Sequence, residues 1–312
     1  MSSLSSVPSR SFGLSFFLLL ASVLSAHSQP SPSTSYFFHR ALDLSIAEPF
    51  SLDVALSSGD ITFSYGRENQ LLIEASAKDA AGNRVPEEFF RNGLLIEQVA
   101  NRIVVRGRPD LSTISSLMKV QYQFYVPFQT DLISRVDAGN QDLVGIAGPA
   151  KLISGLGDIQ ATSVTRALLE ARTGQGKISC SRVARVIAET GAGNITLMED
   201  GPSKATVKKG RGKIEVGGAR GFFEGSTDGG DIHIKAVLHG EWRLNSVSGN
   251  IRIEVPPKAA FNFDAKTSSG QVLIDRDDMQ KPSDEERDSV QQVNGGGKLL
   301  QARSVSGRIS IQ

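Results

Sequence analysis

The sequence has few of the residues that cross-link a fold or fill a large aromatic core. Its 312 residues include one cysteine, one tryptophan and four tyrosines. The lone cysteine, Cys180, has no partner for an internal disulfide. Excess charge of one sign is also missing, because 34 Lys and Arg residues stand against 33 Asp and Glu residues. Such a balance gives no general attraction to nucleic acid or to anionic membranes, so we expect no nucleic-acid partner.

Long apolar runs are scarce, and the most prominent one lies near the N-terminus. The run "FGLSFFLLLASVLSA" follows Arg10, and small residues precede the position after Ser28. A positive residue, a short apolar run and a small-residue site are typical of a secretory signal, although an uncleaved anchor is the alternative. We predict a signal peptide over residues 1–28 and a Pro/Ser linker over residues 29–36. The mature chain is then expected without a transmembrane segment, in the periplasm, at the cell surface or secreted.

Glycine, by contrast, is abundant, with 31 residues, and it recurs in a fixed phrase. From Gly157 onward, glycine, a polar residue and Ile or Val follow one another eight times, the first seven phrases 17 to 21 residues apart and the last after a gap of 37, and Gly59-Asp60-Ile61 is an earlier relative. The glycines of this phrase are Gly157, Gly176, Gly193, Gly212, Gly230, Gly249, Gly270 and Gly307. A recurrence of this kind is the sequence signature of a protein built from stacked repeats.

Two short strands fit into each repeat. Small or apolar side chains alternate with polar ones after each glycine, which indicates a strand with one buried face. A second alternating stretch precedes each glycine, and its aromatic members are expected to stack directly on one another. The apolar residues seven positions before the glycines are Leu169, Val186, Ala205, Phe223, Trp242, Phe263 and Leu300. We therefore predict two strands and two turns in each coil of about 18–19 residues.

One such coil cannot bury its apolar face alone. If equivalent strands of successive coils pair about 4.8 Å apart, all these faces enter one continuous core, and the Ile residues form a column through it. The predicted fold is an all-β parallel β-solenoid, with a positive φ expected at the corner glycines. We expect irregular strands in an N-terminal β cap over residues 37–138, regular coils over 139–312 and an excursion over 277–297. Together they form a single domain over residues 37–312.

The end of the predicted stack and the polar residues raise separate questions. The terminal strand, Arg308–Gln312, is predicted as an open edge that can pair with another chain. Cys180 falls on an inward position, and we expect it to be a buried thiol rather than a nucleophile. His233 is expected to point outward and His239 to lie in a turn, which is a poor metal set.

The glycine-rich phrases also suggest ligands that closer inspection excludes. "GQGKIS" and "GRGKIE" lack the earlier glycine and the following Ser or Thr that a phosphate loop needs. A calcium-binding roll needs acidic ligands in successive turns, but Lys177, Lys213 and Arg308 occupy that column here. We therefore expect no cofactor and no metal.

Several phrases together resemble a known family. "SSGDITF", "GLGDIQA", "GAGNITL", "SVSGNIRIEVP" and "SVSGRISIQ" are similar to the repeats of the bacterial putative-adhesin family of unknown function. "YQFYVPFQTDLISRVDAGN" is similar to the strand with proline that leads into those repeats. The resemblance covers residues 37–312 and implies an exported β-solenoid of the cell envelope. It supplies no catalytic residues.

The favoured hypothesis is an exported, non-enzymatic cell-envelope protein, an adhesin or binding scaffold with a laddered β surface. Its partner would be an envelope or extracellular glycan or protein, bound by outward side chains that include Thr196, Glu215, His233 and Arg252. One alternative is an envelope-stress accessory that acts through a protein partner. The other is a polysaccharide-cleaving β-helix enzyme, which is disfavoured because no outward acidic cluster repeats on neighbouring coils.

Overall fold

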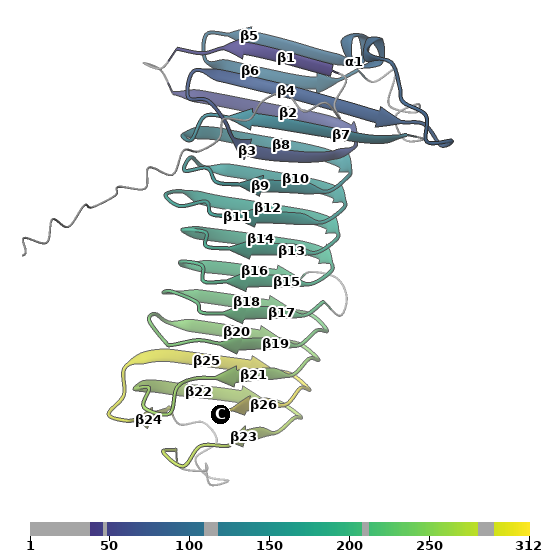
Figure 1. Ribbon diagram of the computed structural model, residues 1–312. Helices are drawn as coiled ribbons and strands as arrows, with labels where there is room; N and C mark the ends of the chain where they lie inside the picture. Colours follow the sequence, from purple (N-terminus) through teal and green to yellow (C-terminus); the bar gives the residue numbers. More distant parts are fainter. Residues whose placement is uncertain (1–37, 46–48, 109–117, 208–211, 280–289) are drawn as a thin grey trace, which may run out of the picture.

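The computed structural model describes residues 38–45, 49–108, 118–207, 212–279 and 290–312. The predicted signal peptide and linker lie outside the described residues, as do residues 280–289 of the predicted excursion. Within these ranges the chain forms two 13-stranded sheets and one short helix, arranged as a tall stack with a wider N-terminal end (Figure 1). No helix in the described part is long and apolar enough to cross a membrane.

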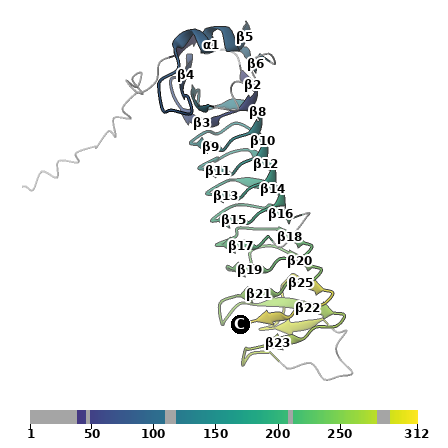
Figure 2. The ribbon, with the colours of Figure 1, turned by 90° about the vertical axis from the view of Figure 1, so that its right-hand side faces the viewer.

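The two sheets stand face to face along the stack, and we name them sheet A and sheet B (Figure 2). In pairing order, sheet A contains β1 (Phe38–Asp43), β4 (Gln70–Lys78), β7 (Lys119–Val126), β3 (Asp60–Tyr65), β9 (Gln141–Val144), β11 (Ile159–Thr162), β13 (Ile178–Ser181), β15 (Ile195–Met198), β17 (Ile214–Gly217), β19 (Ile232–Lys235), β21 (Ile251–Glu254), β26 (Ile309–Ile311) and β23 (Val272–Ile274). Sheet B contains β24 (Gln291–Val293), β22 (Phe261–Thr267), β25 (Lys298–Ser304), β20 (Trp242–Ser246), β18 (Phe223–Thr227), β16 (Ser203–Val207), β14 (Arg185–Ala192), β12 (Leu168–Gln175), β10 (Ala150–Leu156), β8 (Thr130–Ala138), β2 (Phe50–Ser58), β6 (Arg102–Gly107) and β5 (Leu94–Val99).

Each regular coil runs along sheet B, turns at the glycine corner and returns along sheet A. Equivalent strands of neighbouring coils pair in parallel, so that Ile178 pairs with Ile195, and Ile214 with Ile232. These four side chains are fully buried. The predicted parallel solenoid, with two short strands in each coil and an isoleucine column in its core, is therefore confirmed.

The corner glycines are needed chiefly because neighbouring coils approach closely. Gly157 and Gly176 adopt the expected positive φ, at 141° and 154°. Gly249 and Gly307 do not, so the expectation of a positive φ at every corner was wrong. A Cβ on Gly249 would nevertheless lie 1.8 Å from the carbonyl oxygen of Gly230, and one on Gly307 would lie 1.9 Å from that of Gly249. The backbone of the adjacent coil thus occupies the space that a side chain would need.

Polar side chains tie the same corner together. The hydroxyl of Thr173 donates to the carbonyl of Gly157 at 2.9 Å, and equivalent Ser and Thr hydroxyls do the same on other coils. Directly after the glycine, a carboxylate oxygen of Asp158 accepts the backbone N–H of Lys177 at 2.7 Å. Asp and Asn residues repeat this bond between other coils. Each coil therefore satisfies a backbone group of its neighbour, and the corners stay in register.

One coil departs from the predicted alignment. Ala205 pairs with Ala188, and the partner of Val186 is instead Ser203, which is buried. The connection from β16 to Gly212 has two more residues than its equivalent in the preceding coil, and it contains residues 208–211, which are not described. Counting seven residues back from the glycine therefore fails at this coil.

The C-terminal coil lies inside the stack. β26 pairs in parallel with both β21 and β23, so the prediction of an open edge at the terminal strand, Arg308–Gln312, was wrong. At this end of the stack the described edge strand of sheet A is β23, which follows β26 in the pairing order. In sheet B, Leu300 separates Trp242 from Phe263, which breaks the predicted aromatic stack. β22 and β23, which come earlier in the chain, form the coil at the end of the stack, and β25 and β26 form the coil before it. Both coils fit either position because their apolar residues match.

The N-terminal end is built differently from the coils. β2 and β3 stack in parallel on β8 and β9, but β1, β4 and β5 pair with their neighbours antiparallel. The helix α1 (Glu87–Gly93) lies over this end (Figure 2), and its own Phe90 is buried in the core. Phe63 and Phe124 stack with their ring centroids 5.1 Å apart. Aromatic packing and the helix thus cover the end of the core.

Candidate functional site

The four predicted surface residues stand in one row on the outer face of sheet A. Thr196, Glu215, His233 and Arg252 belong to β15, β17, β19 and β21 and are successive pairing partners. The first three are half-buried and Arg252 is exposed. Parallel pairing therefore makes a continuous row, which we call the sheet A column.

Glu254, which the sequence analysis did not single out, is the residue on which the charges of this face converge. His233 Nε2 lies 2.8 Å from one carboxylate oxygen, Arg252 Nε lies 3.1 Å from the same oxygen, and Lys235 Nζ lies 3.4 Å from the other. The hydrogen bond with His233, with further help from the neighbouring positive charges, lowers the pKa of Glu254. Period two was the available signal, since Glu254 follows Arg252 by two residues and shares its face.

The remaining acid of the column is paired as well. Glu215 lies 3.3 Å from Lys213 Nζ, so Glu215 and Glu254 are both partnered by cations. Exposed pairs of this kind contribute under about 1 kcal/mol each to stability. In the described part of the chain, no group of three or more His, Cys, Asp and Glu residues is placed to hold a metal ion. The face is thus polar and largely charge-compensated.

A hollow, which the sequence analysis also missed, runs along the glycine corner where β18, β20, β25 and β22 of sheet B end. We call it the corner groove, and its volume is about 520 Å³. One wall carries Ser226, Asn245, Arg303 and Lys266, which pair across β18, β20, β25 and β22. The other wall carries Asp228, Val247, Val305 and Ser268.

A change in the corner sequence accounts for the groove. In earlier coils glycine follows the corner Ser or Thr, and the strand of sheet B continues, as at Ser154 in β10 and Thr173 in β12. In the last four coils a residue with a side chain follows, and the strand ends at the corner Ser or Thr. There the hydroxyl of Ser246 accepts the N–H of Gly249 at 2.8 Å, which closes a tight turn. The loss of the glycine that directly follows the corner Ser or Thr was the available sequence signal.

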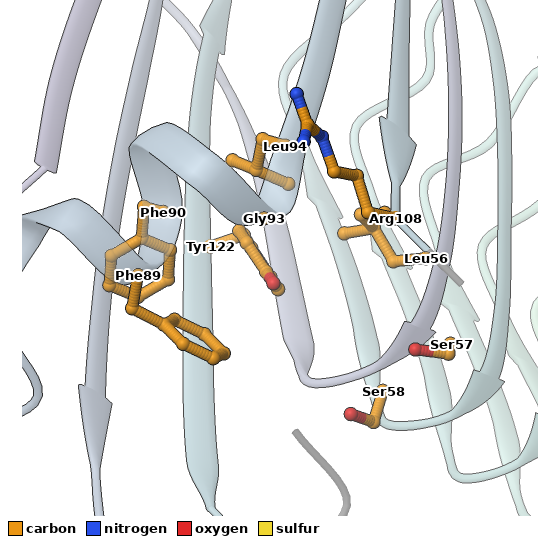
Figure 3. A pocket seen from close by; sticks show the side chains of 10 residues that line it. Leu56, Ser57, Ser58, Phe89, Phe90, Gly93, Leu94, Arg108 and Tyr122 are labelled. Atoms are coloured by element: carbon orange, nitrogen blue, oxygen red, sulfur yellow. The ribbon is translucent and has the colours of Figure 1, made fainter. Parts of the chain in front are cut away.

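A much smaller hollow lies beneath α1. Its volume is about 20 Å³, and Phe89, Phe90 and Leu94 line it with Tyr122 and Arg108 (Figure 3). That volume holds about one water molecule. Burial raises the pKa of Tyr122, which therefore stays neutral. This space is too small for an organic ligand.

Two buried groups lie away from these surfaces. Cys180 is buried as predicted, and burial raises the pKa of its thiol. Asp200 is only 2% exposed and lies at the second turn of its coil, after the strand of sheet A. The equivalent residues of the other coils are apolar, namely Ile146, Val164, Val183 and Ala219. One of its carboxylate oxygens accepts the N–H of Val183 at 2.7 Å, and the other has no partner among the described residues. Burial is the main cause that raises the pKa of Asp200 to about 6. Neither side chain is exposed to solvent, as a catalytic nucleophile or base must be.

Comparisons with known proteins place the fold in context. A structure described as "Putative lipid binding protein" from Parabacteroides distasonis is 12% identical, with 88% of this chain and 96% of that chain covered and a TM-score of 0.38. A structure of "a putative cell adhesion protein" from Clostridium sporogenes is 9% identical, with 88% and 97% covered and a TM-score of 0.19. No curated protein matches this chain.

The family comparison is more extensive. The model of the Toastrack DUF4097 family matches residues 50–312, which include the cap from β2 onward and all the described coils. The resemblance of the repeated phrases to a solenoid family of unknown function is consistent with this match. The chain therefore belongs to the Toastrack DUF4097 family, whose function is unknown.

Proposed function

We propose that this protein is an exported, non-enzymatic binding scaffold of the cell envelope, which recognises its partner with the outer face of sheet A. In this proposal residues 1–28 direct export, residues 29–36 form a linker and residues 37–312 form the binding domain. The partner is an envelope or extracellular glycan or protein with an extended, repeating surface.

The sheet A column with Glu254 is the observation that carries this proposal. Side chains on neighbouring coils stand about 4.8 Å apart, and strand pairing on both sides fixes their spacing. Glu254 holds His233 and Arg252 in place through short contacts to one oxygen. Recognition groups that are already ordered lose little conformational entropy on binding. A partner that runs along the stack can therefore contact several coils at once.

The two carboxylates beside His233 and Arg252, Glu215 and Glu254, support binding rather than glycan cleavage. Cleavage of a glycosidic bond commonly requires two carboxyl groups, one of them with a raised pKa so that it can donate a proton. Glu254 instead has a lowered pKa, and Glu215 is paired with Lys213. Neither has the environment of a general acid at neutral pH.

The proposal is tested by capture of envelope material on the purified exported chain. Immobilised protein is incubated with envelope glycan and protein fractions, and the retained material is quantified for wild type and for a His233→Ala, Arg252→Ala double variant. The matched control is Glu224→Gln, which changes an ion-paired acid on the outer face of sheet B, 2.8 Å from Lys204.

We expect the double variant to retain at least tenfold less material than wild type and the control to retain the same amount. Retention of a single protein rather than a glycan would favour an accessory role through that partner. Wild-type retention at the background level, or equal retention by the double variant, would contradict the proposal.

A further inference from the structure

The corner groove contains polar groups that the protein itself does not use. The side chains of Ser226, Asp228, Asn245 and Ser268 make no hydrogen bond or ion pair to any other described residue. Asp228 and Asn245 lie in neighbouring coils, on either side of the buried row in which Thr227 pairs with Ser246. The groove therefore offers a carboxylate acceptor, an amide that both donates and accepts, and two hydroxyls.

The charges of the groove argue against a simple anion site. Arg303 is bound to Asp264, whose carboxylate and backbone carbonyl accept from its guanidinium. Its charge is thus largely compensated before any ligand arrives. Asp228 on the facing wall would repel an anionic ligand, while Lys266 is the further cation that lines the groove. A ligand without formal charge fits a groove lined by both positive and negative side chains better than phosphate or a uronic acid does.

An apolar strip lies beside these polar groups. Val247 and Val305 are 50% and 51% exposed. They occupy neighbouring coils, because the N–H of Ser306 donates to the carbonyl of Val247 at 3.1 Å. Their methyl groups form one wall of the groove between Asp228 and Ser268. The lining thus combines a small apolar surface with a few converging donors and acceptors, which is typical of small-molecule sites, and its volume of about 520 Å³ falls in the usual range.

We propose that the corner groove binds a neutral oligosaccharide that lies along the stack. A sugar ring presents a C–H face, which Val247 and Val305 contact, and a rim of hydroxyls. Each hydroxyl both donates and accepts, so it donates to the Asp228 carboxylate or accepts from the Asn245 amide. The four coils of the groove extend over about 14 Å, enough for a short oligosaccharide. This inference rests on the proposed role as a binding scaffold and names a second site for it, separate from the sheet A column.

Isothermal titration calorimetry on the full exported chain tests the inference. The probes are cellotetraose, maltotetraose, mannotetraose and chitotetraose, with tetragalacturonate as the acidic counterpart. The variants are Asp228→Asn and Asn245→Ala, whose wild-type side chains are exposed, so that the fold is retained and is checked by thermal melting. The matched control is Glu224→Gln in β18, which lies outside the groove.

We expect at least one neutral tetrasaccharide to bind saturably, and each groove variant to weaken its affinity at least tenfold. Glu224→Gln should leave the affinity unchanged. The inference is overturned if no neutral probe binds at millimolar concentration, if tetragalacturonate binds more tightly than every neutral probe, or if the groove variants bind as wild type does. If envelope capture fails in the sheet A double variant as expected, while no neutral probe binds the wild type, the proposed function stands and this site alone fails.

Discussion

Substitution of Asp200 by asparagine tests how the solenoid accommodates a carboxylate in an apolar corner. Asp200 is 2% exposed and occupies the position that Val183 and Ala219 fill in the neighbouring coils. Asparagine retains an oxygen that accepts the N–H of Val183, a bond of 2.7 Å in the wild type, but it carries no charge. The substitution thus removes the buried charge and keeps the hydrogen bond.

The expected gain in stability follows from the raised pKa of Asp200. Burial raises the pKa of Asp200 from an ordinary 3.8 to about 6, so the folded state binds the proton more tightly than the unfolded chain. The stability contributed by this proton is fully present below about pH 4 and is lost as the pH rises through about 6. A shift of this size corresponds to about 3 kcal/mol at pH 8. Asp200→Asn should therefore be about 2–3 kcal/mol more stable than wild type at pH 8, with little difference near pH 4.

Urea unfolding followed by circular dichroism, at several pH values between 4 and 8, measures this difference. Asp158→Asn is the control, because Asp158 is an exposed aspartate at the glycine corner that also accepts a backbone N–H, at 2.7 Å from Lys177. It should show no comparable gain at high pH. The reasoning is refuted if the difference between wild type and Asp200→Asn does not change with pH, because the carboxylate would then be solvated in the folded state.

Three further predictions concern the stack and its surface. Ile195→Asp places an unpaired charge in the core and should lower the free energy of unfolding by about 4 kcal/mol or more. Thr196→Asp on the outer face should lower it by under about 1 kcal/mol. Equal losses of melting temperature in the two variants would contradict the assignment of inward and outward side chains. Gly249→Ala should destabilise by about 3 kcal/mol in urea unfolding, because its Cβ would meet a carbonyl oxygen at 1.8 Å, and a neutral result would mean that the coils can separate freely. Glu254→Gln should lower stability by up to about 1 kcal/mol at neutral pH. That deficit should vanish as the pH falls through the lowered pKa of Glu254, and a deficit that persisted in acid would point to lost packing instead.

The coil architecture was predictable because each repeat contains the residue pattern that specifies its own strands and turns. The alternation after each glycine fixes which side chains enter the core, and the recurrence of Ile fixes which strands pair. The close approach at Gly249 adds a constraint that only glycine meets, so the corners could be located from sequence as well. These signals are local, and stacking merely repeats them.

The order of the last coils was not predictable for the same reason. The strands at Val272 and Ile309 carry the same phrase, so the pattern does not say which coil lies next to β21. The displaced Ala205 had a similar cause, since an insertion before Gly212 changed the spacing without changing the alternation. Interchangeable coils leave their order to the length and path of the connections.

The candidate sites depended on contacts between coils that the pattern does not specify. The sequence placed Arg252 and His233 on one face, but it did not show that both reach Glu254. The corner groove depends on where the strands of sheet B end, which followed from a hydroxyl such as that of Ser246 closing the turn. Such side-chain geometry becomes visible only when the coils are assembled.

Cysteine pairs on the sheet A column test most directly the claim that residues one coil apart lie side by side. Thr196 and Glu215 are pairing partners, so a Thr196→Cys, Glu215→Cys variant brings two thiols within the Cα separation of about 4.4–6.8 Å that a disulfide needs. Thr196 and His233 lie two coils apart, at about 9.6 Å, which is too far. We predict rapid oxidation to an intramolecular disulfide in the first pair and none in a Thr196→Cys, His233→Cys variant. A disulfide in the second pair, or failure of the first to form one, would contradict the stacked register on which both proposed sites depend.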